Sequence, residues 1–349
     1  MRTKNKLISL FSGAGGLDLG FQQAGFNIIW ANENDKTIWE TYKHNHPKIF
    51  LDTRSITEIK DKEIPNCDGI IGGPPCQSWS LAGSKKGKKG ISDKRGKLIY
   101  EYLRIVKAKK PSFFVFENVP GILSPSNQKE FSKFKERLEN LGYKINYQNL
   151  NAKDYGVPQD RKRVFLIGIK KDLEIIFDFD RISKVKKQNL LFDCIHDLQK
   201  TDFNSLQFAN HEYYEGGFSP IYMSRNRVRS WQETSFTIQA SGRHSPLHPS
   251  AFPMIKKGTD KFIFTKKNIR RLTVRECARI QTFPDNFVFK YNNLNDGYKM
   301  VGNAVPVLLA NKIAVELKKV LEIKEIPKVH KEVIVRTVLG NIYENNSVC

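Results

Sequence analysis

The chain has 349 residues and carries 58 Lys plus Arg against 36 Asp plus Glu, a formal net charge of +22. Hydrophobic residues make up 40% and aromatic residues 11%, which is enough to bury a substantial core and excludes an intrinsically disordered chain. The charge excess predicts a polyanionic partner, nucleic acid in particular, with a merely lysine-rich surface as the alternative.

The length suggests about two domains. No uninterrupted apolar run approaches the ~18 residues that a membrane span needs. The basic start followed by apolar residues is superficially like a signal peptide, but Gly15-Gly16-Leu17-Asp18 after a short β-like run fits a strand and turn better. The 5 cysteines are odd in number and lack CxxC spacing, so neither a disulfide framework nor a zinc cage is expected. We therefore expect an intracellular protein.

The first half of the chain alternates short β-rich runs with helical patterns. Strands are predicted over Lys6–Phe11, Asn27–Asn32, Cys67–Ile71, Ser112–Glu117, Lys144–Leu150 and Arg163–Ile169. Helices are predicted over Gly16–Ala24, Asp35–Asn45 with Asp35 as N-cap, Lys97–Lys109 and Lys129–Leu141. This alternation predicts an α/β fold with a parallel, doubly wound sheet.

The alternation is lost from about Phe179. Residues up to about Tyr298 are rich in Asn, Arg, Ser and aromatic side chains, with a helical period only around Val274–Gln281. Gly302–Pro306 and an apolar helix to about Glu322 then follow, and we expect this helix to pack on the first domain. The predicted organisation is a discontinuous domain of residues 1–178 plus 301–323, a smaller irregular domain of residues 179–300, and a C-terminal extension of residues 324–349.

The first strand leads directly into a glycine-rich turn, Ser12–Gly16, whose glycines permit a tight turn and close approach of a ligand. The pattern departs from GxGxxG because Asp18 stands where the third glycine would be, and its carboxylate disfavours a pyrophosphate. Glu33, about twenty residues on, is placed to accept hydrogen bonds from ribose hydroxyls, and Asp52 to take an adenine amino group. The pattern predicts an adenosine ligand without phosphates; a glycine turn with no ligand is the alternative.

Cys76 is the candidate nucleophile. The preceding Gly72–Pro75 stiffens the backbone after a strand and holds Cys76 at the carboxyl end of the sheet, where doubly wound folds bind ligands. Neighbouring lysines favour the thiolate. The remaining internal cysteines, Cys67, Cys194 and Cys277, are expected to be small buried hydrophobes.

Further along the chain, Glu117 ends the apolar strand that begins at Phe113. A carboxylate there is costly unless it is paired or functional, and desolvation would leave it able to donate a proton. Arg161 and Arg163 would share one face of an extended segment and hold a planar, oxygen-bearing group or a phosphate. A solvated basic loop is the alternative for these arginines.

Together these residues resemble the motifs of the cytosine-C5 DNA methyltransferases. The matches in family order are FSGAGG, Glu33, Asp52, GGPPCQSWS, ENV, QDRKR, RRLTVRECARIQTFP and GNAVP, from Leu7 to about Leu321. The resemblance implies a methyltransferase that uses S-adenosyl-L-methionine, with a catalytic first domain and a target-recognition second domain. The residues that it assigns to the cofactor are Phe11, Ala14, Gly16, Glu33, Asn34, Asp52, Leu98, Asn303 and Ala304.

The resemblance also implies covalent catalysis. Cys76 would attack C6 of cytosine, C5 would take the methyl group, and loss of the C5 proton and of the cysteine would finish the reaction. Glu117 would hydrogen-bond N3, while Arg161 and Arg163 would bind O2 and help to order Cys76. Because these atoms lie inside a stacked duplex, the base must be extruded. Ser84–Lys97, with its glycines and lysines, suits a loop that closes over it.

Arginines of the second domain are the candidate base readers. They alternate within Met223–Arg229, and arginine reads guanine O6 and N7 in bidentate fashion. The candidates are Arg225, Arg227 and Arg243, whereas Arg229 is expected to hold phosphate; neutralisation of the DNA backbone by all of them is the alternative. The variable region HEYYEGGFSPIYMSRNRVRSWQETSFTIQASGRHSPLHP resembles that of the Hae III-type methyltransferases, which act on GGCC.

The expected partner is double-stranded DNA, and the expected state is a monomer in the cytoplasm of a prokaryote, associated with the nucleoid. A cognate restriction endonuclease is expected by family analogy. His211, His244 and His248 lack metal-ligand spacing, so they are expected to be hydrogen-bonding surface residues and no metal is predicted. Arg270–Gln281 is expected to be a packing helix between the domains, without a catalytic role.

Two other functions stay open from the sequence. A tRNA cytosine-C5 methyltransferase would share every catalytic motif, although the long arginine-bearing insertion from Phe179 to Tyr298 favours duplex DNA. A catalytically silent DNA-binding protein is the other, and the intact Cys76, Glu117 and both arginines argue against it.

Overall fold

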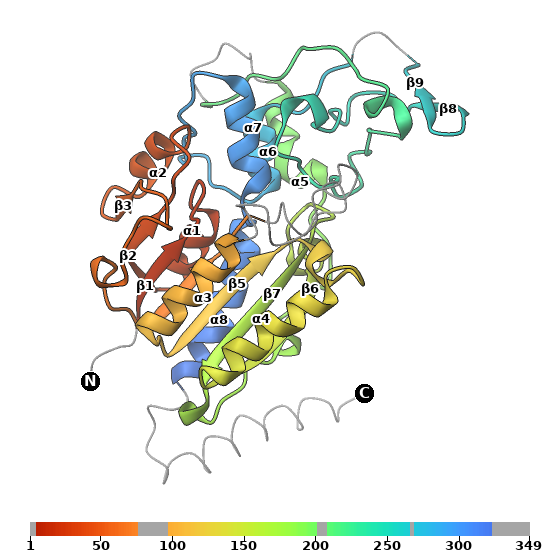
Figure 1. The fold of residues 1–349 in the computed structure, drawn as a ribbon. Coiled ribbons are helices and arrows are strands. Elements are labelled where there is room, and N and C mark those ends of the chain that lie inside the picture. Colours follow the sequence, from red (N-terminus) through yellow and green to blue (C-terminus); the bar gives the residue numbers. More distant parts are fainter. Residues whose placement is uncertain (1–4, 76–96, 201–207, 266–268, 323–349) are drawn as a thin grey trace, which may run out of the picture.

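The structure is a computed structural model that describes residues 5–75, 97–200, 208–265 and 269–322. Its centre is a seven-stranded sheet of order β3-β2-β1-β4-β5-β7-β6 (Figure 1). The strands are β1 (Lys6–Leu10), β2 (Asn27–Asn32), β3 (Phe50–Asp52), β4 (Gly69–Gly72), β5 (Phe113–Asn118), β6 (Tyr143–Asn151) and β7 (Lys162–Lys170). The predicted doubly wound α/β class is confirmed, and the predicted strands match to within a few residues.

The direction of β7 corrects the expectation of an all-parallel sheet. The strands β1 to β5 pair in parallel, but β7 lies antiparallel to both β5 and β6. A parallel neighbour requires a long crossover connection, usually a helix. The chain between Asn151 and Lys162 is too short for one, so β6 and β7 form a hairpin. The three-residue β3 at the sheet edge has no sequence pattern long enough to predict it.

Helices cover both faces of the sheet (Figure 1). They are α1 (Gly16–Gln23), α2 (Trp39–Asn45), α3 (Lys97–Lys109), α4 (Gln128–Asn140) and α8 (Val307–Glu322). The side chains of β5 alternate between the two faces: Phe113 and Val115 belong to the core with α1 and α8, while Phe114 and Phe116 belong to the core with α3 and α4. This period of two follows from strand geometry, and burial on both faces explains the continuous apolar run.

One helix differs from its predicted bounds, and a predicted helix packing is observed. Helix α2 begins at Trp39 and not at Asp35, because the Asp35 carboxylate caps a preceding turn by accepting from the Thr37 backbone N–H at 3.1 Å. Helix α8 approaches α1 closely enough that a Cβ on Gly20 would lie 2.5 Å from the Ala310 Cβ. The glycine therefore permits the contact between these helices.

A second lobe lies above the sheet in Figure 1. It contains α5 (Leu191–Ile195), α6 (Val274–Ile280), α7 (Leu294–Asn303) and the hairpin of β8 (Ile255–Gly258) and β9 (Lys261–Ile263). The helices share an apolar cluster that also includes Ala14 and Ile38 of the sheet lobe, whereas a small separate cluster supports the outer loops around Tyr222 and Leu247. Of these elements only α6 was predicted, because the others are short or lack a clear period.

Leu294–Glu322 is the one stretch of the described chain that is long and apolar enough to cross a membrane. Most of its apolar window, 72%, is buried inside the protein. It comprises α7 and α8, which are separated by Ala304–Pro306 and pack into the cores of both lobes. Its apolar character is therefore accounted for by core packing.

Candidate functional site

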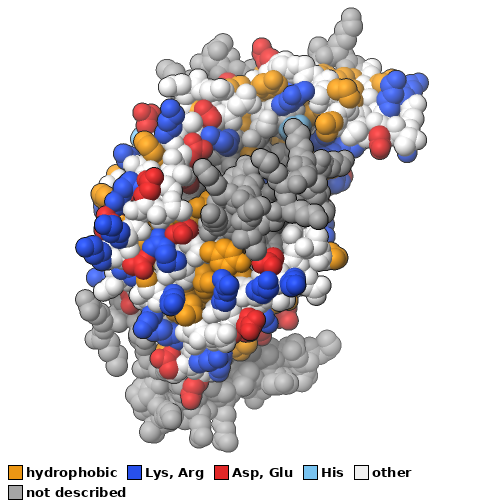
Figure 2. All heavy atoms as spheres, viewed as in Figure 1, with side chains coloured by type: hydrophobic (Ala, Val, Ile, Leu, Met, Phe, Trp, Pro, Cys, Tyr) orange, Lys and Arg blue, Asp and Glu red, His pale blue; other side chains and the backbone are white. Residues whose placement is uncertain are grey.

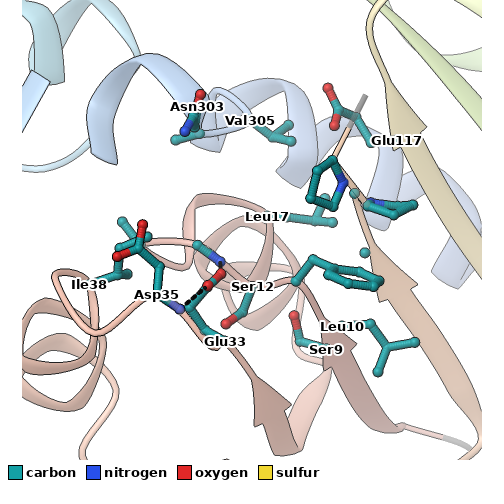
Figure 3. Close-up of a pocket in the computed structure, with 18 of the residues that line it drawn as sticks. Ser9, Leu10, Ser12, Leu17, Glu33, Asp35, Ile38, Glu117, Asn303 and Val305 are labelled. Atoms are coloured by element: carbon teal, nitrogen blue, oxygen red, sulfur yellow. Dashed lines mark hydrogen bonds between the residues drawn. The ribbon is translucent and has the colours of Figure 1, made fainter. Parts of the chain in front are cut away.

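A cavity of about 430 Å³ lies at the carboxyl ends of the parallel strands. Its walls come from the segments that follow β1, β2, β4 and β5, together with the junction between α7 and α8. Figure 3 shows Glu33 and Asp35 on one side of this cavity, and Glu117 and Asn303 on others. The cavity thus lies where doubly wound folds bind their ligands.

Most of the residues predicted to hold a cofactor line this cavity. They are Phe11, Ala14, Gly16, Glu33, Asn34, Leu98, Asn303 and Ala304. Asp52 is absent from the lining. Its carboxylate accepts hydrogen bonds from Arg54 Nε at 3.0 Å and Arg54 Nη2 at 2.7 Å. These bonds lower the pKa of Asp52. The predicted contact between Asp52 and an adenine amino group stays a prediction. Ser55 and Ile56 line the cavity instead.

The glycine-rich turn is held tightly by the protein itself. Gly15 has φ +87°, and a Cβ there would lie 2.2 Å from His46 Nε2. A Cβ on Gly16 would lie 2.6 Å from the carbonyl oxygen of Val305. The first glycine is therefore required by backbone conformation and the second by the close approach of the α7–α8 junction.

Glu33 fixes the shape of the same turn. Its Oε2 accepts from the Gly13 N–H at 2.9 Å and its Oε1 from the Asp35 N–H at 2.8 Å. Burial raises the pKa of this carboxyl, and these backbone hydrogen bonds oppose the shift. Each oxygen retains a further lone pair, so the carboxylate can still accept hydrogen bonds from a ligand hydroxyl.

Asp18 is a cavity-lining carboxylate for which no ligand role was predicted. Its oxygens accept from Ser9 Oγ at 2.6 Å and from Tyr42 Oη at 2.5 Å, and the side chain is fully buried. Burial raises its pKa to about 6, against the effect of these two hydrogen bonds. The position of Asp18 inside a GGxD motif was a signal for it, but the hydroxyl partners come from elements distant in sequence.

Glu117 lies at the end of β5 and faces the same cavity (Figure 3). Burial raises its pKa, while the nearby charges of Arg163 and Arg161 lower it. Arg163 Nε is 3.1 Å from Glu117 Oε1, and Asn118 Nδ2 donates to the Pro74 carbonyl at 3.0 Å. A polar cluster thus joins β5 and β7 to the Gly72–Pro75 segment.

Cys76 lies outside the described residues, as do residues 84–96 of the predicted closing loop and the extension 324–349. The residues before Cys76 are described, and Gly72–Pro75 line the cavity beside Glu117. A Cβ on Gly73 would lie 2.7 Å from Glu117 Oε2. A side chain at this position would therefore have to displace the carboxylate.

Arg161 is held differently from Arg163, although its charge, like that of Arg163, acts on Glu117. Its Nη1 donates to the Ile238 carbonyl at 3.0 Å, and its Nη2 donates to the carbonyls of Gly302 at 2.8 Å and Ala304 at 3.0 Å. Arg161 is 1% exposed and lines neither of the two cavities. Its donors are directed to backbone carbonyls of segments far away in sequence.

A second cavity of about 430 Å³ lies between β7 and the outer loops of the upper lobe. It is lined by Pro120, Asp160, Lys162, Arg163, Arg225, Asn226, Arg227, Phe236, Thr237, Gln239, His244 and Pro246. Arg163 lines both cavities and therefore stands between them. Figure 2 shows Lys and Arg side chains spread over the viewed side of the sheet lobe and others at the end of the upper lobe that carries the β8–β9 hairpin, where Lys256, Lys257 and Lys261 are exposed.

The three candidate base readers have different environments. Arg225 and Arg243 are exposed, but Arg227 is buried and donates from Nε to the Tyr222 carbonyl at 2.9 Å and from Nη2 to the Ile221 carbonyl at 3.1 Å. The guanidinium of Arg227 also stacks over the Tyr222 ring at 4.6 Å. The alternating arginines therefore do not form one exposed row, because the segment is not a regular strand.

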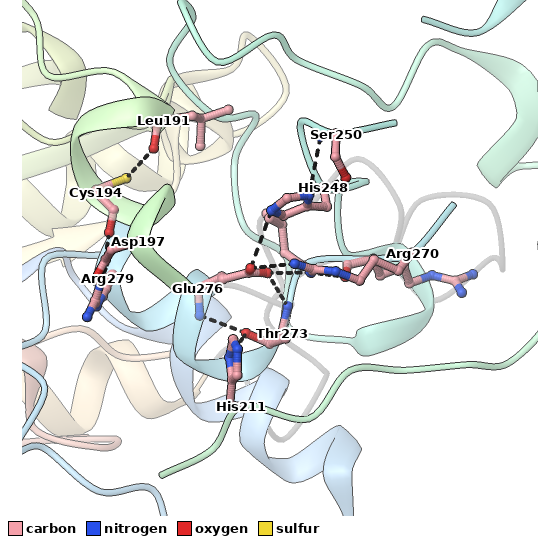
Figure 4. A network of polar contacts seen from close by, with 12 residues as sticks. Leu191, Cys194, Asp197, His211, His248, Ser250, Arg270, Thr273, Glu276 and Arg279 are labelled. Carbon is pink, nitrogen blue, oxygen red and sulfur yellow. Dashed lines mark hydrogen bonds and ion pairs between the residues drawn. The ribbon is translucent and has the colours of Figure 1, made fainter. Parts of the chain in front are cut away.

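Two of the three histidines that were expected at the surface are buried, whereas His244 is partly exposed. His211 and His248 are buried, and His248 Nε2 lies 3.5 Å from Glu276 Oε1 (Figure 4). Glu276 also accepts two hydrogen bonds from Arg270 at 2.8 Å. Burial lowers the pKa of His248 to about 4, so it is neutral near pH 7. Within the described ranges, no group of three or more His, Cys, Asp or Glu is arranged to hold a metal ion.

Comparison with known proteins gives consistent matches over nearly the whole chain. The family model of the C-5 cytosine-specific DNA methylases matches residues 5–319. The Type II methyltransferase M.MthTI of Methanothermobacter thermautotrophicus is 54% identical over 328 residues, which are 90% of this chain and 98% of that protein. The Type II methyltransferase M.NgoPII of Neisseria gonorrhoeae is 53% identical over 331 residues, which are 91% of this chain and 96% of that protein.

Solved structures with the same fold include two more distant methyltransferases. The methyltransferase EhMeth of Entamoeba histolytica is 21% identical with a TM-score of 0.68, covering 92% of this chain and 98% of that one. The Dnmt2 methyltransferase of S. pombe is 18% identical with a TM-score of 0.64, and the match covers 91% of this chain and 98% of that one. At this level of identity the likeness is one of fold.

Proposed function

The chain belongs to the family of C-5 cytosine-specific DNA methylases, and from this premise we propose that it is a Type II methyltransferase that modifies one cytosine in a short duplex site and protects host DNA in a restriction–modification system. S-adenosylmethionine is the methyl donor of this family. The relatives named Type II methyltransferases, at 53% and 54% identity, support the assignment. The observation that carries the proposal is one cavity lined both by Glu33 beside the glycine turn and by Glu117.

The cavity fits S-adenosylmethionine, which carries a sulfonium and an ammonium group but no phosphate. Its charged lining residues are the acids Asp18, Glu33, Asp35 and Glu117 and the bases Arg163 and Lys299. This excess of acids suits a cationic ligand and disfavours a pyrophosphate. We expect Glu33 to accept from the ribose hydroxyls and the turn Ser12–Gly16 to surround the rest; the bound cofactor supplies an electrophilic methyl group.

The chemistry that we propose begins with the thiolate of Cys76, which adds to C6 of the cytosine. Glu117 holds a proton at N3, so that the electron pair reaches C5 without leaving an anion on the ring. C5 would then take the methyl group as the bond from that group to the sulfonium sulfur breaks and its electron pair leaves on sulfur. Loss of the C5 proton to a base, cleavage of the bond between Cys76 and C6, and return of the N3 proton to Glu117 would restore the aromatic ring and the free thiolate.

Arg163 is the arginine that we assign to cytosine O2. Its position beside Glu117 and on both cavities supports this role. The cytosine must leave the base stack to reach Glu117, so base extrusion is part of the proposal. The closing role of residues 84–97 rests on their composition and on their place after Cys76 in the sequence.

The proposed target is GGCC, with Arg225, Arg227 and Arg243 as candidate readers of guanine. Exposure of Arg225 and Arg243 supports direct contact. Arg227 would use only the donors that it does not give to Tyr222 and Ile221. The second cavity, which contains Arg225 and Arg227, supports an approach of DNA between the two lobes.

We assign residues 1–178 and 301–323 to the catalytic domain and residues 179–300 to the target-recognition domain. Two observations support this division. Helix α8 packs against α1 in the core of the sheet lobe, and the residues around Tyr222 form a small separate core in the upper lobe. We further propose that the protein acts as a monomer in the cytoplasm, where a cognate restriction endonuclease would share its target.

Methylation of DNA from cells that express the protein tests this function directly. Bisulfite sequencing should reveal 5-methylcytosine at one position of GGCC, and expression of Cys76→Ser provides the matched control. Purified protein with labelled S-adenosylmethionine should then modify duplex DNA and not tRNA. Transfer to tRNA alone would favour the tRNA methyltransferase, and unimpaired transfer by Cys76→Ser would exclude the proposed nucleophile.

A further inference from the structure

The α7–α8 junction has the cofactor cavity on one side and the upper lobe on the other. Asn303, Ala304 and Val305 line the cofactor cavity. The preceding Gly302 packs so closely on the upper lobe that a Cβ there would lie 2.3 Å from the carbonyl carbon of Gln239. We call Gly302–Ala304 the junction segment; it contacts both binding regions.

The segment of the upper lobe at this contact is Ser235–Gln239, which we call the recognition segment. Its Thr237 and Gln239 line the second cavity, where DNA is expected. The Ser235 N–H donates to the Pro158 carbonyl at 2.9 Å, and the Asp160 N–H donates to the Ser235 carbonyl at 2.8 Å. The recognition segment is thereby attached to the chain that leads into β7.

Arg161 links the two segments through a single guanidinium. One nitrogen, Nη1, donates to the Ile238 carbonyl of the recognition segment at 3.0 Å. The other, Nη2, donates to the carbonyls of Gly302 and Ala304 in the junction segment at 2.8 and 3.0 Å. Since Arg161 is buried, separation of the segments would leave a buried cation with unsatisfied donors, which is strongly unfavourable.

Two fully buried glutamines make a second link. Gln159 Oε1 accepts from the Ile238 N–H at 2.9 Å, and its Nε2 donates to Gln281 Oε1 at 2.9 Å. Gln281 Nε2 in turn donates to the carbonyls of Val301 at 2.8 Å and Ala304 at 3.2 Å. The C=O of Ile238 is therefore bound by Arg161, which binds the junction segment directly, and its N–H by Gln159, which is linked to that segment through Gln281.

We propose that Gln159, Arg161 and Gln281 are positioning residues that hold the recognition segment in register with the junction segment, so that cofactor and DNA bind cooperatively. The proposal rests on the proposed DNA methyltransferase function. A ligand that orders either segment also orders the other, because the shared buried hydrogen bonds cannot be kept if only one segment moves. None of the three side chains needs to contact either ligand.

The test is the binding of a GGCC-containing duplex with and without saturating S-adenosylhomocysteine, a non-reacting probe of the cofactor cavity. The wild-type protein should bind the duplex at least about fivefold more tightly with the probe, the lower end of typical coupling factors. Gln281→Met keeps the side-chain volume but removes its hydrogen bonds. In this variant the coupling factor, which is the ratio of the duplex affinities with and without the probe, should fall below about twofold. The affinity for the probe in the absence of DNA should change little.

Arg279→Gln is the matched control. Arg279 lies in α6, two residues before Gln281, but its guanidinium pairs with Asp197 and Asp285 and with neither segment. It should keep the wild-type coupling factor. Gln159→Met should reproduce the loss, and it replaces Gln281→Met if the latter does not fold.

The absence of coupling in the wild-type protein, or its retention in both glutamine variants, would overturn the proposal. Methyl transfer to the same duplex, measured in parallel, separates this outcome from failure of the proposed function. Transfer without coupling rejects only the positioning role. No transfer by the wild-type protein to this duplex, to genomic DNA or to tRNA rejects the function on which it rests.

Discussion

Arg163 Nε lies 3.1 Å from Glu117 Oε1, with both side chains nearly buried at 13% and 12% exposure. Burial alone would favour the protonated carboxyl, and the neighbouring cation moderates that preference. The two residues come from adjacent antiparallel strands, where Glu117 is paired in register with Phe165. The sheet thus places at the cavity of the proposed chemistry a carboxyl group whose pKa is raised by burial and lowered by a neighbouring guanidinium.

Replacement of the Glu117 carboxyl should slow methyl transfer. We expect Glu117→Gln to lower the single-turnover rate by about 10²–10⁴-fold, since an amide cannot hold a transferable proton at N3. Affinity for the duplex should stay within a small factor of the wild-type value. A single-turnover rate close to wild type in folded protein would show that Glu117 has no proton role.

Arg163 should set the pH range of the reaction. If protonated Glu117 is required, activity falls as pH rises through its pKa. The charge of Arg163 lowers that pKa, so its removal raises it. In Arg163→Met the alkaline limb of the pH–rate profile should therefore move to higher pH, although the maximum rate also falls. If the alkaline limb, measured by single turnover, stays at the wild-type pH, the titration that causes it is not that of Glu117.

The close approach of Gly73 to Glu117 gives a steric test. A Cβ at this position would lie 2.7 Å from Glu117 Oε2. Gly73→Ala should displace the carboxylate and reduce the methylation rate by about 10²-fold, the usual scale for misplacing a reacting group by about 1 Å. Gly258→Ala, where no atom lies within 4 Å of the added Cβ, should have no effect on the rate.

Asp18 should make the stability depend on pH. Its pKa rises from 3.8 to about 6 on folding, so the folded state binds the proton more tightly. Its contribution to stability is complete below about pH 4 and is lost as pH rises through about 6. The loss is about 3 kcal/mol. Urea unfolding of wild type and Asp18→Asn over this range should show it in the wild type only; parallel curves would contradict the assignment.

The recognition arginines should respond differently to truncation. Arg225→Ala should lose about 1–3 kcal/mol of discrimination at one base pair of the target. A uniform loss across unrelated sequences would identify a phosphate contact instead. Arg227→Ala should also lower thermal stability, because the carbonyls of Tyr222 and Ile221 lose their donors. Binding to duplexes with single substitutions, together with melting curves, distinguishes the two variants.

Local patterns in the sequence were sufficient for most of the sheet and for much of the cofactor cavity. The short apolar runs between helical patterns predicted β1, β2, β4 and β5, because each of these strands is buried on one or both faces. Glycines were informative where the backbone has a positive φ, as at Gly15, or approaches another backbone segment closely, as at Gly16. Contiguous motifs at strand ends predicted Glu33 and Glu117 because parallel strands bring their carboxyl ends to one edge.

The roles of the charged side chains were decided by tertiary structure. Arg161 and Arg163 are equivalent in sequence, yet one is paired with backbone carbonyls from residues 238, 302 and 304 and the other with Glu117. Asp52 is likewise occupied by Arg54. A buried charge is committed to whichever partners the fold brings near it, and those partners lie too far along the chain for spacing to indicate them. The sequence by itself therefore determined the chemistry available, while the packing of distant segments determined which groups remain free to perform it.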